Sequence, residues 1–165
     1  MDILKLSDIL GQEIVELRFH YIPANEYDLQ SFHSYIKLAS DTIINIPKFD
    51  DNDYLHLTQD NLNYFKNMFD TGDPVNDKVK AYFVGQRIVD FYFGYYNDEV
   101  DLDRSAFIKL SNSYYLSENN FGPVGLNNID LIILDEKQFS EEMKRLNSIK
   151  VDVRSFAQTK NAANN

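Results

Sequence analysis

The residues best placed to do chemistry are two histidines on neighbouring strand-like segments. His20 and His33 lie on the same side of two segments that a loop over residues 23–29 would connect, so their imidazoles can approach each other. A zinc or iron site needs a third ligand, for which Glu16 is the nearest candidate. Because two imidazoles alone do not form a metal site, we favour exposed strand histidines and predict no metal and no cofactor.

A second possible chemistry is that of a carboxylate pair. Residues 70–72 read Asp-Thr-Gly, the tripeptide of aspartic proteases, but that mechanism needs two such loops and the corresponding residues 146–148 read Leu-Asn-Ser. Gly72 also follows a predicted helix, which glycine commonly ends. The sequence contains no nucleophile elbow, zinc-protease helix or phosphate-binding loop. We therefore expect a protein that is not an enzyme.

Two acidic clusters stand beside tyrosines and are the candidate partner-binding residues. The first comprises Asp50, Asp51, Asp53 and Tyr54, and the second comprises Tyr95, Tyr96, Asp98, Glu99, Asp101 and Asp103. Tyrosine next to carboxylate suits the energetically dominant positions of a protein interface. A surface that only keeps the protein in solution explains such clusters equally well.

The charge balance restricts the class of partner. Sixteen Lys plus Arg against 26 Asp plus Glu give a net charge of −10, which repels phosphate backbones and anionic membranes. We therefore predict a protein partner rather than nucleic acid or a membrane. No apolar run approaches the roughly 18 residues that cross a bilayer, and no signal-peptide pattern is present, so a cytoplasmic location is expected. The absence of Cys excludes disulfides and thiolate zinc sites.

The elements that carry these residues recur along the chain. Residues 11–38 and 85–110 match at twelve positions when two single-residue deletions are allowed in the second copy, against about two expected by chance. Both copies begin Gly-Gln-X-Ile-Val and end Ile-Lys-Leu, followed by a short polar turn and another strand-like run. We predict an internal duplication.

The same repeat predicts the fold class. Each copy ends in a helix that has a polar N-cap and three apolar residues on one face. These are Thr58 with Leu62, Phe65 and Phe69, and Asp135 with Phe139, Met143 and Leu146. Alternation over residues 15–21 and 89–95 predicts strands with one buried and one solvent face, burying Val15, Phe19, Val89 and Phe93.

We therefore predict one α+β domain over residues 1–152, mostly antiparallel sheet with helices on one face. It is built from two related halves, residues 1–73 and 74–152. Residues 153–165 are expected to form a flexible C-terminal tail.

A small, acidic, cysteine-free and tyrosine-rich domain without a catalytic motif resembles the immunity proteins of bacterial contact-dependent growth inhibition and other polymorphic toxin systems. The resemblance lies in the general character of the whole chain. It implies a cytoplasmic inhibitor that neutralises a cognate basic toxin domain, such as a nuclease, through an acidic, tyrosine-rich surface.

Two other functions fit the same sequence. One is a small-molecule-binding or hydrolytic domain with a site between the halves, in a groove lined by Glu16, His20, Tyr92 and Tyr96. The other is an assembly subunit that pairs through an exposed sheet edge. A deep pocket with convergent polar groups would favour the first, and self-association the second.

Overall fold

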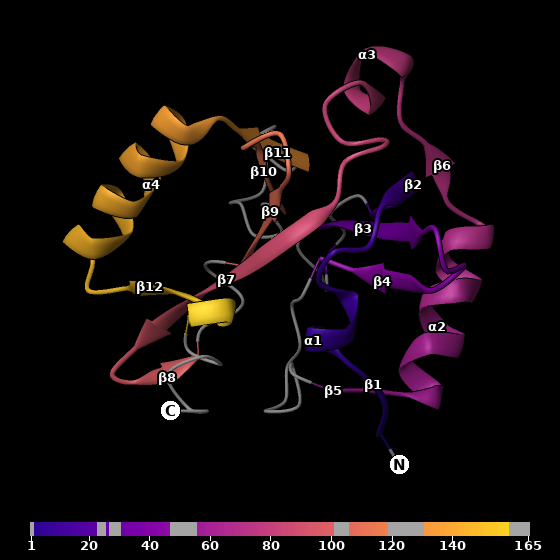
Figure 1. Cartoon of the computed structure of the whole chain (residues 1–165), viewed down its shortest axis with the longest axis horizontal. Coiled ribbons are helices and arrows are strands. Elements are labelled where there is room, and N and C mark those ends of the chain that lie inside the picture. The colour runs from indigo at the N-terminus through magenta and orange to yellow at the C-terminus, as the bar shows by residue number, and fades with distance from the viewer. Residues whose placement is uncertain are drawn as a thin grey trace.

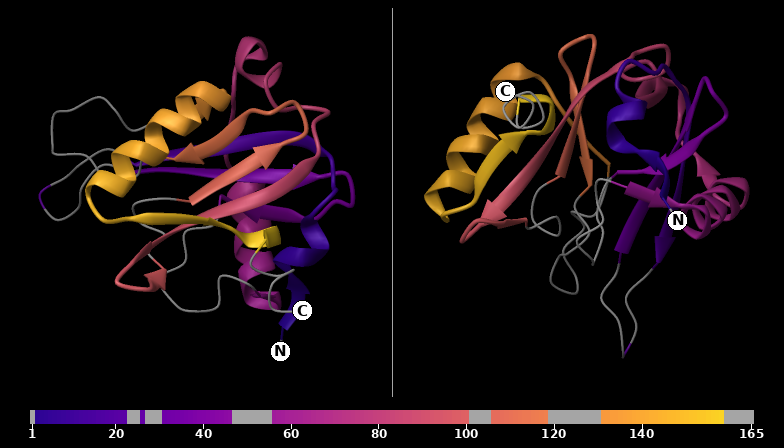
Figure 2. Two further views of the ribbon diagram at one scale, coloured as in Figure 1. Left: turned by 60° about the vertical axis from the view of Figure 1, so that its left-hand side comes forward. Right: turned by 60° about the horizontal axis from the view of Figure 1, so that its bottom comes forward.

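Two antiparallel sheets lie face to face, and a long helix covers the outer side of each sheet (Figure 1, Figure 2). The computed structural model describes residues 2–22, 26, 31–46, 56–100, 106–118 and 131–158. The α+β class predicted from the sequence is confirmed.

The first half of the chain forms one sheet and its helix. Its strands are β2 (Ile14–Ile22), β3 (Ser31–Leu38), β4 (Ile43–Asn45) and β6 (Asp73–Pro74), in the order β4-β3-β2-β6. Helix α2 (Gln59–Asp70) covers the outer face. The short elements β1 (Asp2–Lys5), α1 (Leu6–Ile9) and β5 (His56–Thr58) complete this half, with β1 paired to β5.

The second half has a similar order of elements, with β8 (Glu99–Val100) added and, among the described residues, without a counterpart of β1. Its strands are β7 (Ile88–Tyr96), β8, β9 (Ala106–Leu110), β10 (Tyr115–Glu118), β11 (Leu131–Leu134) and β12 (Asp152–Ser155). They form the order β11-β10-β9-β7-β12, with β8 paired to β7. Helix α3 (Asp77–Lys80) precedes the sheet, and helix α4 (Glu136–Ser148) covers its outer face.

The core lies between the sheets, and a second apolar layer lies under each helix. Buried side chains from both halves, among them Leu17, Ile36 and Phe91, belong to one continuous cluster. On the outer faces, Tyr115 stacks on Phe139 of α4 at a ring distance of 3.7 Å. The expectation that one face of each sheet meets solvent is therefore wrong, because the helices cover that face.

Both long helices begin at the predicted caps. The side chain of Thr58 accepts a hydrogen bond from Asn61 N, and that of Asp135 accepts one from Gln138 N. In each case the third helical residue bonds back to the cap, which satisfies two amide groups that the first turn leaves unpaired. The predicted apolar faces point inward, with Phe65, Phe69, Phe139 and Leu146 buried.

The two halves are joined by four backbone hydrogen bonds that are symmetrical under exchange of the halves. Gly11 N donates to Ile88 O at 2.7 Å, and Gly85 N donates to Ile14 O at 2.8 Å. Ile14 N donates to Gln86 O and Ile88 N donates to Gln12 O, both at 2.9 Å. This junction consists of the residues of the repeated Gly-Gln-X-Ile-Val segment.

The equivalence of the halves extends beyond the junction. In both sheets the strand that follows the long helix pairs with the first long strand of the same sheet, β6 with β2 and β12 with β7. The halves differ in that β5 pairs with β1, whereas β11 pairs with β10. Descent of the two halves from one duplicated unit stays a prediction.

A bulge at the start of each long strand overturns part of the predicted core. Ile14 pairs with Leu38 but Glu16 pairs with Lys37, which leaves Val15 as an extra residue, and Val89 takes the same place in β7. Val15 is 40% exposed and Val89 is 42% exposed, so the prediction that both are buried is wrong.

The C-terminal segment is ordered further than predicted. Residues 153–155 belong to β12, which pairs with β7, and residues 156–158 form a helical turn. Phe156 packs edge-on against Phe91 and Phe93 of the core. The prediction of a flexible tail that begins at residue 153 is therefore wrong, because the Phe156 ring packs against the core. Residues 159–165 lie outside the described residues.

Candidate functional site

The β7–β8 hairpin is the first candidate site, and it forms a corner of the molecule, at lower left in Figure 1. Tyr96 pairs with Glu99 across a two-residue turn formed by Asn97 and Asp98. These two residues have φ values of 51° and 63°, as the tight turn matching the twist of paired strands requires. The turn fixes the direction in which Asp98 and Glu99 leave the sheet.

Arg154 of β12 braces this hairpin from the neighbouring strand. Its guanidinium donates to Asp98 Oδ1 at 3.0 Å and to Asp152 Oδ2 at 2.8 Å, and lies 4.2 Å from the centre of the Tyr95 ring. The hydrogen bonds to Asp152 and Asp98 raise the pKa of Arg154 above its usual value. The hairpin is thereby held in place by a charged contact and by a cation above an aromatic ring.

The exposed groups of this corner are tyrosine and carboxylate. Tyr96 is 41% exposed, the Asp98 side chain is 91% exposed, and Glu99 is exposed. Tyr95 is half-buried under Arg154 and is therefore less accessible than the sequence suggested. We call Tyr96, Asp98, Glu99 and Asp152 the hairpin surface.

The other six predicted partner-binding residues belong to parts of the chain that the structure does not describe. Asp50, Asp51, Asp53, Tyr54, Asp101 and Asp103 lie outside the described residues. Whether the two acidic clusters share one surface therefore stays a prediction.

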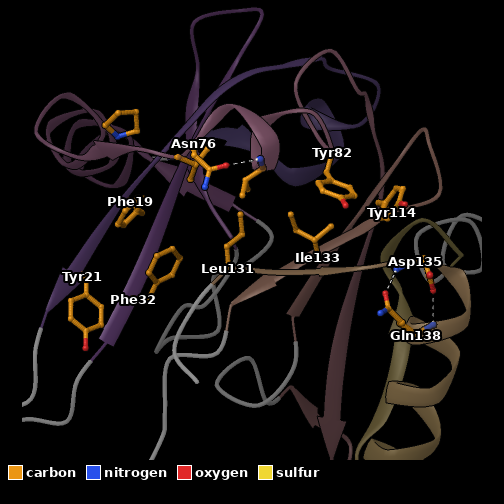
Figure 3. A pocket seen from close by; sticks show the side chains of 13 residues that line it. Phe19, Tyr21, Phe32, Asn76, Tyr82, Tyr114, Leu131, Ile133, Asp135 and Gln138 are labelled. Atoms are coloured by element: carbon orange, nitrogen blue, oxygen red, sulfur yellow. Dashed lines mark hydrogen bonds between the residues drawn. The ribbon is translucent and has the colours of Figure 1, made fainter. Parts of the chain in front are cut away.

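An open groove of about 1000 Å³ between the two halves is the second candidate site (Figure 3). The first sheet contributes Phe19, Tyr21 and Phe32. The segment from β6 through α3 contributes Pro74, Val75, Asn76, Val79 and Tyr82. The second half contributes Tyr114, Leu131, Ile133, Asp135 and Gln138. Its volume is at the upper end of the range for small-molecule sites.

The groove is apolar at one end and polar at the other. The rings of Phe19 and Phe32 stack at a centroid distance of 5.1 Å, and Asp135 and Gln138 lie apart from them, beyond Tyr114 (Figure 3). Asp135 Oδ1 accepts from Gln138 N at 2.8 Å, so the helix cap also holds this carboxylate at the groove.

The groove predicted between the halves exists, but its predicted lining residues are wrong. Glu16 bonds to Arg18, and His20 bonds to α2, on the outer face of the first sheet. Tyr92 packs against Phe139 under α4, and Tyr96 belongs to the hairpin surface. The inner faces, which sequence alternation assigned wholly to the core, supply the groove instead.

The two histidines do pair as predicted, with His20 and His33 opposite each other in the β2–β3 register. His20 Nε2 lies 2.7 Å from the accepting carbonyl oxygen of Met68, in the last turn of α2. Within the described part of the chain, no group of three or more His, Asp or Glu side chains could hold a metal ion. The arrangement holds helix to sheet.

Two carboxylates, those of Glu118 and Asp90, are buried and hydrogen-bonded, which the sequence did not predict. Glu118 Oε1 accepts from Ser34 N at 2.6 Å across the two sheets, and both residues are buried. Asp90 lies on the face of β7 that alternation predicted to meet solvent, but it accepts from Ala157 N at 2.9 Å and from the Ser155 hydroxyl. Nothing in the local sequence distinguishes such carboxylates from exposed ones, because their partners lie far away in the chain.

Two buried tyrosines, Tyr115 and Tyr35, have raised pKa values. Burial, with the hydrogen bond to Glu136, raises the pKa of Tyr115 above its usual value, and burial next to Tyr64 does the same for Tyr35. Both phenols are therefore held neutral in the folded protein.

Comparisons with protein-family models, with curated proteins and with solved structures give no match. Among the helices of the described residues, none has the length and apolarity needed to cross a membrane.

Proposed function

We propose that this chain is a non-enzymatic binding protein, an immunity protein that neutralises a cognate basic toxin domain in the bacterial cytoplasm. The observation that carries the proposal is the hairpin surface, where an exposed tyrosine and three carboxylates lie at a braced turn and on the neighbouring strand β12. This composition suits recognition of a basic protein.

The geometry supports binding because the hairpin needs little ordering when a partner arrives. The turn at Asn97 and Asp98 fixes the backbone, and Arg154 holds the Asp98 carboxylate. A surface already held in its bound conformation loses less conformational entropy on association. The hairpin therefore offers its carboxylates in fixed positions.

The charge supports the choice of a basic partner. Arg154 offsets one of the three carboxylates of the hairpin surface, so the surface keeps a negative balance within a chain of net charge −10. Electrostatic steering of this kind raises association rates by about 10- to 1000-fold and weakens as salt is added.

The test pairs the chain with the C-terminal domain of a large toxin encoded beside its gene. The wild type is expected to protect cells that express this domain and to form a tight complex with it. The variant Asp98→Lys with Glu99→Lys is expected to associate about tenfold or more slowly at low salt and to lose protection.

The matched control is Asp70→Lys with Glu141→Lys, on exposed positions of the two long helices α2 and α4. Both double variants change the net charge from −10 to −6, so only the position of the charge differs. Equal association rates for the two variants would assign the effect to net charge and contradict the hairpin surface. Absence of any toxin gene beside this one would contradict the immunity function.

A second candidate function, small-molecule binding between the halves, is favoured by the groove. Its test uses 1-naphthylmethanol, an uncharged aromatic alcohol, in calorimetric titration of the full chain. Tyr82→Ala is expected to weaken binding about tenfold because Tyr82 lines the groove. Tyr64→Ala, an equivalent change of an exposed tyrosine on α2, is expected to leave it unchanged.

A further inference from the structure

The chemistry of the groove indicates a class of ligand, and this inference rests on the second candidate function. The apolar end presents aromatic faces. Phe19 and Phe32 of the first sheet stack with an interplanar angle of 24°, and Leu131 and Ile133 of β11 line the same groove. A flat ring or a short apolar chain is the body that such side chains accommodate.

The polar end offers hydrogen-bonding groups that the described residues leave unused. The hydroxyls of Tyr82 and Tyr114 make no hydrogen bond within the described part of the chain, although their rings contact each other at 5.2 Å. The Gln138 side chain bonds to Asp135 N through Oε1, which leaves its amide NH₂ to donate. Groups of this kind, converging at one end of an apolar groove, fix the orientation of a ligand.

Charge decides which polar head fits this end. Among the described residues that line the groove, Asp135 is the only one with a charged side chain. Its Oδ1 accepts from Gln138 N, and it forms no ion pair within the described residues, so its second oxygen is available to a donor. A cationic head is attracted here and an anionic head is repelled.

We propose that the groove binds an amphipathic amine, with an aromatic or apolar body between the Phe19–Phe32 pair and β11. Its ammonium group is held at Asp135, with the Tyr82 and Tyr114 hydroxyls beside it. The ligand is a small molecule, because the groove volume of about 1000 Å³ corresponds to a molecule of that class.

The experiment titrates the full chain with three probes that share one ring system: 1-naphthylmethylamine, 1-naphthylmethanol and 1-naphthoate. The amine is expected to bind most tightly, the alcohol about tenfold more weakly, and the carboxylate most weakly. Calorimetry at two salt concentrations measures the three affinities, and added salt is expected to weaken only the amine appreciably.

The deciding variant is Asp135→Asn, because asparagine caps a helix as well as aspartate and α4 keeps its first turn. In this variant the amine is expected to bind no more tightly than the alcohol, whose own affinity stays unchanged. Equal affinities of the three probes for the wild type, or an amine preference that survives Asp135→Asn, would overturn the ligand class while the groove stands as a site. Failure of all three probes to bind would overturn the groove site as well.

Discussion

Replacing the two junction glycines tests whether the halves are joined by equivalent structures. Gly11 has a φ of 88° and Gly85 a φ of 85°, a region that costs an ordinary residue about 1–2 kcal/mol. An added Cβ would meet no atom within 4 Å at either position, so backbone strain is the only cost in the folded state. The lower chain entropy of alanine offsets about 0.4–1 kcal/mol of it.

We therefore expect Gly11→Ala and Gly85→Ala each to lower the free energy of unfolding by about 1 kcal/mol. The loss is expected to be the same at both positions within about 0.5 kcal/mol, and the double variant to lose about 2 kcal/mol because strain at two separate residues adds. Such a loss is a measurable fraction of the roughly 5–15 kcal/mol that stabilises a typical domain.

Urea denaturation followed by circular dichroism measures these losses, with an unchanged denaturant slope showing that the folded state is the same. Asparagine tolerates positive φ better than alanine, so Gly11→Asn and Gly85→Asn are expected to cost less. Losses that differ by more than about 1 kcal/mol between the two positions, or asparagine variants as unstable as the alanine ones, would refute the reasoning.

Three further outcomes follow from the contacts of the core. Phe93→Ala is expected to cost about 3–5 kcal/mol in urea denaturation, and Phe19→Ala less than half of that, because Phe93 is fully buried and Phe19 half-buried; similar costs would contradict this. Because the pKa of Tyr115 is raised, its neutral form stabilises the fold at pH values below the ordinary tyrosine pKa of 10.0, and this contribution is lost as the pH rises further. Tyr115→Phe is therefore expected to make the melting temperature fall less steeply at alkaline pH. Removing residues 157–165 is expected to lower the melting temperature more than removing residues 159–165, because the shorter chain loses the amide of Ala157 that bonds to buried Asp90.

Local sequence signals predicted the two long helices and the shared face of His20 and His33. Thr58 and Asp135 cap their helices because a short polar side chain meets the first free amide groups, an interaction confined to four consecutive residues. His20 and His33 share a face because side chains alternate with a period of two along both strands. Such features depend on neighbours in the chain and can be predicted without the fold.

Long-range packing explains what the sequence did not predict. Val15 and Val89 continue the apolar alternation, yet a bulge turns each of them outward at the junction of the halves. The sequence places Phe156 in a polar tail, but in the structure its ring packs against Phe91 and Phe93. Each outcome depends on residues more than sixty positions away or on backbone geometry that alternation does not record.

The residues that line the groove were missed for a related reason. Phe19 and Phe32 have the sequence pattern of core residues, and only the position of β11 and α3 leaves space beside them. Asp135 was identified as a cap, which it is, but its position at a groove depends on side chains from both halves of the chain. A side chain with one local role gives no sequence signal of a second role.

Some of the positions at which the halves differ belong to the two candidate sites. The shared Gly-Gln-X-Ile-Val segments build the symmetrical junction, and the shared Ile-Lys-Leu segments end in matching tight turns at Asp41 and Ser113. The β7–β8 hairpin, in contrast, corresponds to a segment of the first half with a different length, and Asp135 lines the groove whereas its counterpart cap Thr58 does not. If the hairpin surface and the groove act in binding, substitutions there should change affinity without changing stability, and substitutions in the junction should do the reverse.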